Sequence, residues 1–319
     1  MNSELQKSFS SKSLLYLKNP FEVEGLFPSH SEDPFAEKPF AYKGFNSSQN
    51  FVLSNIGISC RKGLKEELNQ DNFFVFSKSQ ILVAGVFDGH GENGHIVSSL
   101  AKKFLRQNLI TDLEIIQNPP ISIRSSFVKT QEKIVQKFIR AKNDCLSSGC
   151  STMVAVVNNS SLYIAHIGNC KAFIAKRVQG NLMVTPLTSE HNIDNPDEKS
   201  RILSVSCHEL LSVQNDKKNC ESSQNSLKLT RSFGNTGFLD LGMISDPFIY
   251  EMKLVGDENS VIICSEGVWK YVNMGEMSNI LTENNCENAC NVMENLAWSR
   301  WIEKYNDFVE DMTVIVIPL

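Results

Sequence analysis

Short apolar runs rich in β-branched and aromatic residues follow one another closely through the first half of the chain. They occupy residues 72–76, 81–87, 151–157, 162–168 and 171–176. Runs of this length and composition are typical of buried strands. Similar runs predict strands around 247–254 and 260–265 and a last strand over residues 312–319. The pattern therefore predicts a protein with a large proportion of β-sheet.

Helical spacing appears in two stretches between the second and third apolar runs. Apolar residues recur every three or four positions around 96–105 and around 134–139, and Pro119-Pro120 separates the two stretches. A third helix is predicted to open at Asn195-Pro196-Asp197, where a side-chain cap precedes a proline in the first turn. Two more helices are predicted near the C-terminus, over residues 274–283 and 287–304.

Groups of strands interrupted by paired helices favour an α+β fold. We expect a central antiparallel β-sandwich flanked by helices on both faces. Residues 1–48 are rich in Ser, Phe and Pro without a sustained period, and they predict an irregular N-terminal extension. Residues 49–319 are expected to form one domain, in which the polar segment at about 204–226 is a flap.

Composition and charge exclude several functional classes of protein. The 319 residues are 41% hydrophobic and 21% charged, which is ordinary for a globular protein, and the net charge of −5 argues against a nucleic-acid partner. No apolar stretch approaches the roughly 20 residues of a membrane-spanning helix, and the N-terminus lacks a secretory signal. We therefore expect an intracellular protein, cytoplasmic or nuclear. The nine cysteines contain no C-x-x-C pair, so reduced thiols are expected.

Acidic residues stand at four predicted strand ends. They occur in Asn69-Gln70-Asp71, Asp88-Gly89-His90, Ser265-Glu266-Gly267 and Glu310-Asp311. A single acid at such a place is more often a turn former or a helix cap. An acid beside a buried strand end is costly to desolvate, however, and carboxylates that converge there suit hard cations. The fourfold repetition predicts a metal cluster.

Nine segments of the chain resemble the metal-dependent protein phosphatase family, protein phosphatase type 2C. They follow the family's order: GLKEELNQDNFFVF (63–76), VFDGHGENGH (86–95), SGCSTMVAVV (148–157), IAHIGNCKAFIA (164–175), LTSEHNIDNPDEKSRI (187–202), LTRSFGN (229–235), ISDPFI (244–249), VIICSEGVWKYV (261–272) and EDMTVIVI (310–317). The resemblance runs from about residue 50 to 319. The first segment is more similar to protozoan and plant members than to animal ones.

The resemblance implies two Mg²⁺ or Mn²⁺ ions at one end of the sandwich and hydrolysis of serine and threonine phosphate monoesters without a phosphoenzyme. By position, Asp88 would bridge the ions and the Gly89 carbonyl would ligate one of them. Asp71 would hold the second ion through water, and Glu266 and Glu310 would complete the first. Two such ions would activate a bridging water. The implied partners are phosphorylated proteins, and the family habit is a monomer.

Two further roles follow from the resemblance. His90 would be the general acid that protonates the leaving oxygen, because the pKa of a histidine lies near working pH. Arg61 sits where the family places a phosphate-binding arginine, although its spacing to Asp71 is longer than in animal members. Lys62 or Lys65 are the alternatives for that role.

Several positions depart from the family pattern. Glu266 and Glu310 stand where the family has aspartate, which keeps the charge but lengthens the side chain by one methylene. Asp311 is the alternative ligand beside Glu310, although its side chain is expected on the other face of the strand. Asn169, Asn235 and Lys270 replace family acids, which predicts weaker metal binding.

Two functions therefore remain open. The first is an active serine/threonine phosphatase, with a preference for Mn²⁺ because its looser geometry tolerates altered ligands. The second is a pseudophosphatase that binds or scaffolds phosphoproteins. The intact Asp88-Gly89-His90 favours the first, and the lengthened Glu266 and Glu310 favour the second. Away from the site, Glu198 and Arg201 are expected to form a surface ion pair.

Overall fold

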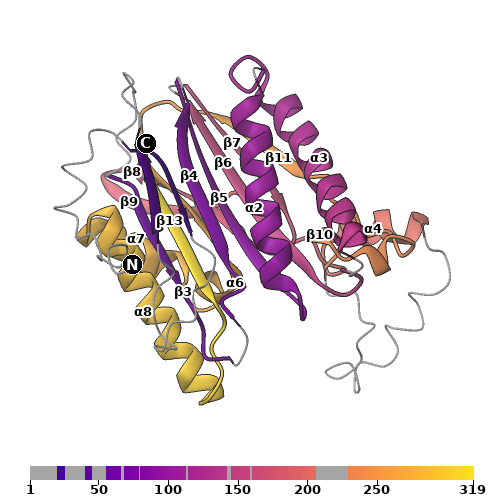
Figure 1. Ribbon diagram of the computed structural model, residues 1–319. Coiled ribbons are helices and arrows are strands. Elements are labelled where there is room, and N and C mark those ends of the chain that lie inside the picture. The colour runs from indigo at the N-terminus through magenta and orange to yellow at the C-terminus, as the bar shows by residue number, and fades with distance from the viewer. Residues whose placement is uncertain are drawn as a thin grey trace, which may run out of the picture.

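Two antiparallel β-sheets lie face to face, with helices covering both outer faces (Figure 1). The computed structural model describes residues 20–25, 40–44, 55–65, 68–78, 80–112, 114–141, 145–158, 160–205 and 229–319. Within these ranges the expected α+β sandwich with helices on both faces is confirmed.

The larger sheet has eight strands among the described residues, in the order β11-β7-β6-β5-β4-β1-β2, with β10 paired to β6. Its strands are β1 (Pro20–Gly25), β2 (Phe40–Gly44), β4 (Asn72–Lys78), β5 (Ile81–His90), β6 (Gly149–Asn158), β7 (Ser161–Ile167), β10 (Phe233–Gly234) and β11 (Phe248–Lys253). The smaller sheet has the order β3-β13-β12-β8-β9. Its strands are β3 (Gly57–Arg61), β8 (Lys171–Val178), β9 (Asn181–Pro186), β12 (Glu258–Cys264) and β13 (Met312–Pro318).

The helices divide between the two outer faces. Helices α2 (Gly94–Thr111) and α3 (Pro119–Arg140) cover the larger sheet, whereas α7 (Met274–Glu283) and α8 (Cys286–Tyr305) cover the smaller one (Figure 1). Three short helices lie near the ends of strands: α4 (Pro196–Val205), the 3-10 helix η2 (Thr236–Phe238) and α6 (Glu266–Trp269). None of the described helices combines the length and apolar character that a membrane span needs.

The alternation of side chains along each strand builds three apolar layers. Phe73 and Val75 of β4 point between the sheets, whereas Phe74 and Phe76 point toward α2 and α3. This is the two-residue period of a strand that is buried on both faces. A third layer joins the smaller sheet to α7 and α8 and includes the buried Trp301. The seven cysteines in the described ranges form no disulfide bond with one another.

The N-terminal segment corrects one expectation. Residues 20–25 and 40–44 are not irregular, because they form β1 and β2, and β1 pairs with β4 through Val23 opposite Val75. β4 would otherwise be an open sheet edge, and the two added strands cover it. The domain boundary near residue 48 stays a prediction. The expected flap at 204–226 falls mostly on residues 206–228, which lie outside the described residues.

A second correction concerns Glu198. This residue is 2% exposed, not on the surface. Its carboxylate accepts hydrogen bonds from Arg201 at 2.8 Å, from Arg231 at 2.5 Å and from Thr230 at 2.6 Å. This network could not be predicted from the sequence, because Arg231 lies 33 positions from Glu198 along the chain. Two guanidinium groups hold the pKa of Glu198 well below its usual range despite burial.

Candidate active site

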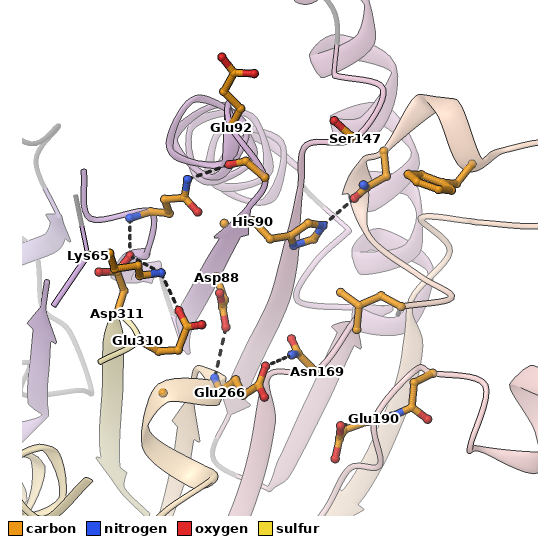
Figure 2. A pocket seen from close by; sticks show the side chains of 18 of the residues that line it. Lys65, Asp88, His90, Glu92, Ser147, Asn169, Glu190, Glu266, Glu310 and Asp311 are labelled. Carbon is orange, nitrogen blue, oxygen red and sulfur yellow. Dashed lines mark hydrogen bonds and ion pairs between the residues drawn. The ribbon is translucent and has the colours of Figure 1, made fainter. Parts of the chain in front are cut away.

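One end of the sandwich carries a pocket of about 850 Å³. Five of the predicted metal-site residues and the predicted general acid line it: Asp88, Gly89, Glu266, Glu310, Asp311 and His90. They come from the end of β5, the start of α6 and the segment before β13. Figure 2 shows Asp88 among the side chains of these residues that it labels: His90, Glu266, Glu310 and Asp311, together with Lys65 and Asn169. The structure thus brings together segments that are far apart in the sequence.

Asp88 lies at the centre of the carboxylates. Its Oδ2 accepts a hydrogen bond from the backbone N–H of Glu266 at 3.2 Å (Figure 2). Burial, together with the negative charges of Asp71, Glu266 and Glu310, raises the pKa of Asp88 well above its ordinary value. Negative charge is therefore crowded around Asp88, and a cation beside this carboxylate would be stabilised.

Asp71 lies behind the pocket wall, not among the lining residues. Its side chain is buried, and Oδ2 accepts hydrogen bonds from Ser265 Oγ and Thr313 Oγ1, each at 2.7 Å. Burial and the charge of Asp311 raise the pKa of Asp71 to about 7. Asp71 thus adds negative charge close to Asp88 while it joins the start of β4 to the ends of β12 and β13.

Position 89 requires a glycine, because the backbone of two neighbouring segments lies close to it. A Cβ at this position would lie 2.5 Å from the carbonyl oxygen of Gly94 and 2.7 Å from that of Gln70. The Gly89 N–H also donates to the Gln70 carbonyl at 3.3 Å. Glycine therefore lets the end of β5 pass close to the segment before β4. Its role as a carbonyl ligand stays a prediction.

His90 is hydrogen-bonded to Asn235, with 2.7 Å between Nε2 and Oδ1 (Figure 2). The same Oδ1 accepts a hydrogen bond from Ser232 Oγ at 2.7 Å. Because an amide oxygen only accepts, Nε2 of His90 carries the hydrogen. Burial lowers the pKa of His90. Burial therefore favours the neutral ring, and the proton on Nε2 faces Asn235.

Both oxygens of Glu266 are already engaged. Lys270, one helical turn further along, donates to Oε1 at 2.6 Å, and Asn169 Nδ2 donates to Oε2 at 2.6 Å. Asn169 and Lys270 are two of the positions at which the sequence departs from the family. The contact between Glu266 and Lys270 could be expected, because residues four positions apart on a helix are neighbours. No pattern in the sequence indicated the contact between Glu266 and Asn169.

Glu310 and Asp311 have different surroundings. Lys65 Nζ lies 2.6 Å from Glu310 Oε2 and 3.3 Å from Asp311 Oδ2. Asp311 also accepts backbone hydrogen bonds from Gly63 at 2.7 Å and from Gln70 at 2.9 Å. The Glu310 side chain is 36% exposed and that of Asp311 is 3% exposed. The Glu310 carboxylate is thus paired with Lys65 but exposed to the pocket, while the buried Asp311 accepts from the segments before β4.

Arg61 lies away from the pocket, on the side of α8. Its guanidinium contacts Glu294 and Asn295, each at 3.3 Å, and covers the ring of Trp298. This position does not support the phosphate-binding role expected from the sequence. Of the two alternatives, Lys65 lines the pocket and Lys62 does not. The register of β3 directs the Arg61 side chain toward α8, and this explains why Arg61 does not line the pocket.

The donor types fit a divalent cation at Asp88, because carboxylate and carbonyl oxygens suit Mg²⁺ and Mn²⁺. The raised pKa of Asp88 supports the same conclusion. In the described part of the chain, however, no group of three His, Cys, Asp or Glu side chains is arranged to hold a metal ion. Glu266 and Glu310 would have to leave Lys270, Asn169 and Lys65 before they could join Asp88.

Solved structures with the same fold include two from distant organisms. A serine-threonine phosphatase 2C from Toxoplasma gondii superposes with a TM-score of 0.70 at 14% identity, over 94% of this chain and 99% of that chain. A C. elegans sex determining protein superposes with a TM-score of 0.65 at 15% identity, over 82% of this chain and 64% of that chain. At these identities the likeness supports the fold alone.

Two plant proteins are similar in sequence. The rice protein "Probable protein phosphatase 2C 64" (Oryza sativa subsp. japonica) is 26% identical over 277 residues, which cover 81% of this chain and 63% of that protein. This chain thus spans less than two thirds of the rice protein. The Arabidopsis thaliana "Probable protein phosphatase 2C 72" is 24% identical over 294 residues, which cover 86% of this chain and 88% of that protein.

The sequence profile described as "Protein phosphatase 2C" matches residues 55–299 of this chain. That match includes the end of β5 and the whole of α6, which supply Asp88 and Glu266 to the pocket. Since it covers more than half of the 319 residues, the chain belongs to the protein phosphatase 2C family.

Proposed function

We propose that this chain is a protein serine/threonine phosphatase that hydrolyses phosphoserine and phosphothreonine with Mg²⁺ or Mn²⁺. The observation that carries the proposal is the crowding of negative charge around Asp88, beside a histidine that holds a proton in the same pocket. A cation at Asp88 would offset this charge and attract a phosphate group. Family membership supports the same activity.

The residues that would hold two such ions are Asp88, the Gly89 carbonyl, Glu266 and Glu310, with Asp71 acting through water. Bound divalent ions supply an activated water and offset the charge of the phosphoryl oxygens. Lys65 lines the pocket, with Nζ 2.6 Å from Glu310 Oε2. We assign Lys65, in place of Arg61, to phosphate binding.

His90 provides the proton that the leaving serine or threonine oxygen needs. The hydrogen bond from Nε2–H to Asn235 fixes the ring, and in the protonated imidazolium form the second nitrogen, Nδ1, carries the proton that passes to the leaving oxygen. Burial lowers the pKa of His90, which makes this imidazolium a stronger acid. Ser232 supports the acceptor oxygen of Asn235 from the other side. Asn235 is thus a positioning residue for His90 and takes the place of an acid in the family.

The test is phosphate release from a phosphothreonine peptide, titrated separately with Mn²⁺ and Mg²⁺, with a phosphotyrosine peptide as the comparison. We expect release from phosphothreonine only, and half-saturation at a lower concentration of Mn²⁺ than of Mg²⁺. The double variant Glu266→Asp, Glu310→Asp should shift the preference toward Mg²⁺, because shorter side chains restore the tighter geometry that Mg²⁺ demands. Equal release from both peptides would contradict the proposal.

A second candidate function is a phosphoprotein-binding module without turnover. The specific observation in its favour is that both glutamates are paired with lysines, so that neither is free to ligate an ion. This function predicts no phosphate release with either ion, together with saturable binding of the phosphothreonine peptide measured by fluorescence anisotropy. The unphosphorylated peptide is the control.

A further inference from the structure

We infer that Lys270 and Lys65 are built-in counter-cations of this site, which compete with a divalent cation for Glu266 and Glu310. The inference rests on the proposed function, because it assumes that the cation sits at Asp88. It adds that the chain carries its own positive charges at two of the carboxylates that the ion would need.

Lys270 is held against Glu266 by the helix itself. The two residues are four positions apart at α6, and Nζ lies 2.6 Å from Oε1. Both side chains are partly exposed, at 38% and 30%. Lys270 Nζ also lies 5.3 Å from the ring centroid of Trp301, which favours an ammonium group at this place. Asn169 donates to the other carboxylate oxygen, so both oxygens of Glu266 have a partner without an ion.

Lys65 is held by two carboxylates at once. Its ammonium group lies 2.6 Å from Glu310 and 3.3 Å from Asp311, and its side chain is 14% exposed. Two backbone N–H groups fix the Asp311 carboxylate, so Asp311 cannot move if the Lys65 side chain changes its position. Lys65 is therefore a permanent positive charge at the edge of the cluster (Figure 2).

The consequence is a site whose metal affinity is set by two opposed contributions. Asp88 and the buried Asp71 attract a divalent ion, whereas each ammonium group repels it and occupies a ligand. Unit charges about 4 Å apart interact appreciably even in a high dielectric. We therefore expect the native chain to stay folded without a metal and to bind Mn²⁺ more weakly than a variant that lacks one ammonium group.

The test is Mn²⁺ binding to the full chain, measured by isothermal titration calorimetry and by the electron paramagnetic resonance signal of free Mn²⁺. Lys270→Gln removes the ammonium group and adds no carboxylate. We expect its Kd for Mn²⁺ to fall at least about fivefold. Lys270→Arg keeps the charge and should bind as the native chain does. Lys103→Gln, an exposed lysine of α2, makes the same change in net charge away from the pocket and should leave the Kd within about twofold.

Two results would overturn the inference. One is a Lys270→Gln variant that binds Mn²⁺ no better than Lys103→Gln. The other is a native chain whose melting temperature falls on treatment with EDTA, because such a chain would depend on a metal for its fold. Lys65→Gln is the second variant, for use if Lys270→Gln does not fold by circular dichroism, and its expected change has the same direction.

Asp88→Asn separates failure of the inference from failure of the proposed function. If Asp88→Asn loses Mn²⁺ binding while Lys270→Gln behaves as the native chain does, the site at Asp88 stands and the lysine competition is wrong. If Asp88→Asn binds Mn²⁺ as tightly as the native chain, both the proposed site and the inference are wrong.

Discussion

Arg61 lays its guanidinium on the indole ring of Trp298, with Cζ 3.8 Å from the ring centroid. Glu294, on the same helix, lies 3.3 Å from Arg61 Nη1. The arginine thus joins β3 to α8 at a place where the sequence predicted a phosphate contact. Stacking and ion pairing of this kind stabilise a fold without taking part in a reaction.

Arg61→Met tests this structural role. It keeps most of the apolar stem but loses the stacked cation, and we expect the free energy of unfolding to fall by about 1–2 kcal/mol. Unfolding in urea measures the loss, and the exposed Arg177→Met is the control, with a change within about 0.5 kcal/mol. A large rise in KM for a phosphothreonine peptide, with unchanged stability, would restore the role predicted from the sequence.

Asp311 is expected to act as a structural clamp. Its carboxylate accepts from the backbone of both Gly63 and Gln70, and an amide in its place presents only one accepting oxygen. Asp311→Asn should therefore lower the free energy of unfolding by about 2–3 kcal/mol, since one buried N–H loses its partner. The exposed Asp307→Asn should change it by less than about 0.5 kcal/mol. Equal urea midpoints for the two variants would rule the clamp out.

Gly89 should not tolerate even one added methyl group. Gly89→Ala places a Cβ within 2.7 Å of two backbone carbonyl oxygens, so the end of β5 has to move or unfold. We expect a loss of at least about 2 kcal/mol in the free energy of unfolding. Gly275→Ala, on the exposed first turn of α7, should leave stability unchanged or raise it. Thermal unfolding measures the comparison, and equal melting temperatures for the native chain and both variants would contradict the prediction.

The stacked pair of His166 and His191 predicts a loss of stability in acid. The ring centroids are 4.2 Å apart, and burial lowers the pKa of His166 to about 4 and that of His191 to about 2. The unfolded chain binds protons on both below about pH 6.5 and the folded chain does not, so folding stability falls as the pH falls. Each histidine contributes a slope of up to about 1.4 kcal/mol per pH unit in the range between its folded pKa and its unfolded pKa of about 6.5.

His191→Phe isolates this contribution. The raised pKa values of Asp71 and Asp88 act in the opposite direction, but they are common to the native chain and the variant. Between pH 6 and pH 5 the urea-derived stability of the native chain should therefore fall by about 1.2 kcal/mol more than that of His191→Phe. Parallel curves for the two proteins would show that His191 is already charged in the folded state.

Much of the fold could be predicted from local patterns. The dense β-branched runs of β5 and β6 and the capped start of α4 at Pro196 all lie where the sequence places them. β1 was missed, although Phe21 and Val23 alternate with Glu22 and Glu24, because a Pro- and Ser-rich surrounding hides the alternation. The strand is also stabilised by pairing with β4, and a contact of that range leaves no local signal.

The candidate site likewise contains residues that the sequence could predict and contacts that it could not. Asp88, Gly89 and His90 could be predicted because one short segment carries them into the pocket. The pairing of Lys65 with Glu310 could not, since the two residues are 245 positions apart and meet only when β3 and β13 pair. Arg61 shows the converse, because the position matched a family role while the strand register turned the side chain away.

The central claim is that Asp88 holds the cation on which phosphatase activity depends. The most direct measurement is the rate of phosphate release from a phosphothreonine peptide at saturating Mn²⁺, for the native chain and for Asp88→Asn. The account predicts release by the native chain and a rate at least about 100-fold lower for the variant. No release by the native chain at any Mn²⁺ concentration, or equal rates for the two proteins, would contradict it.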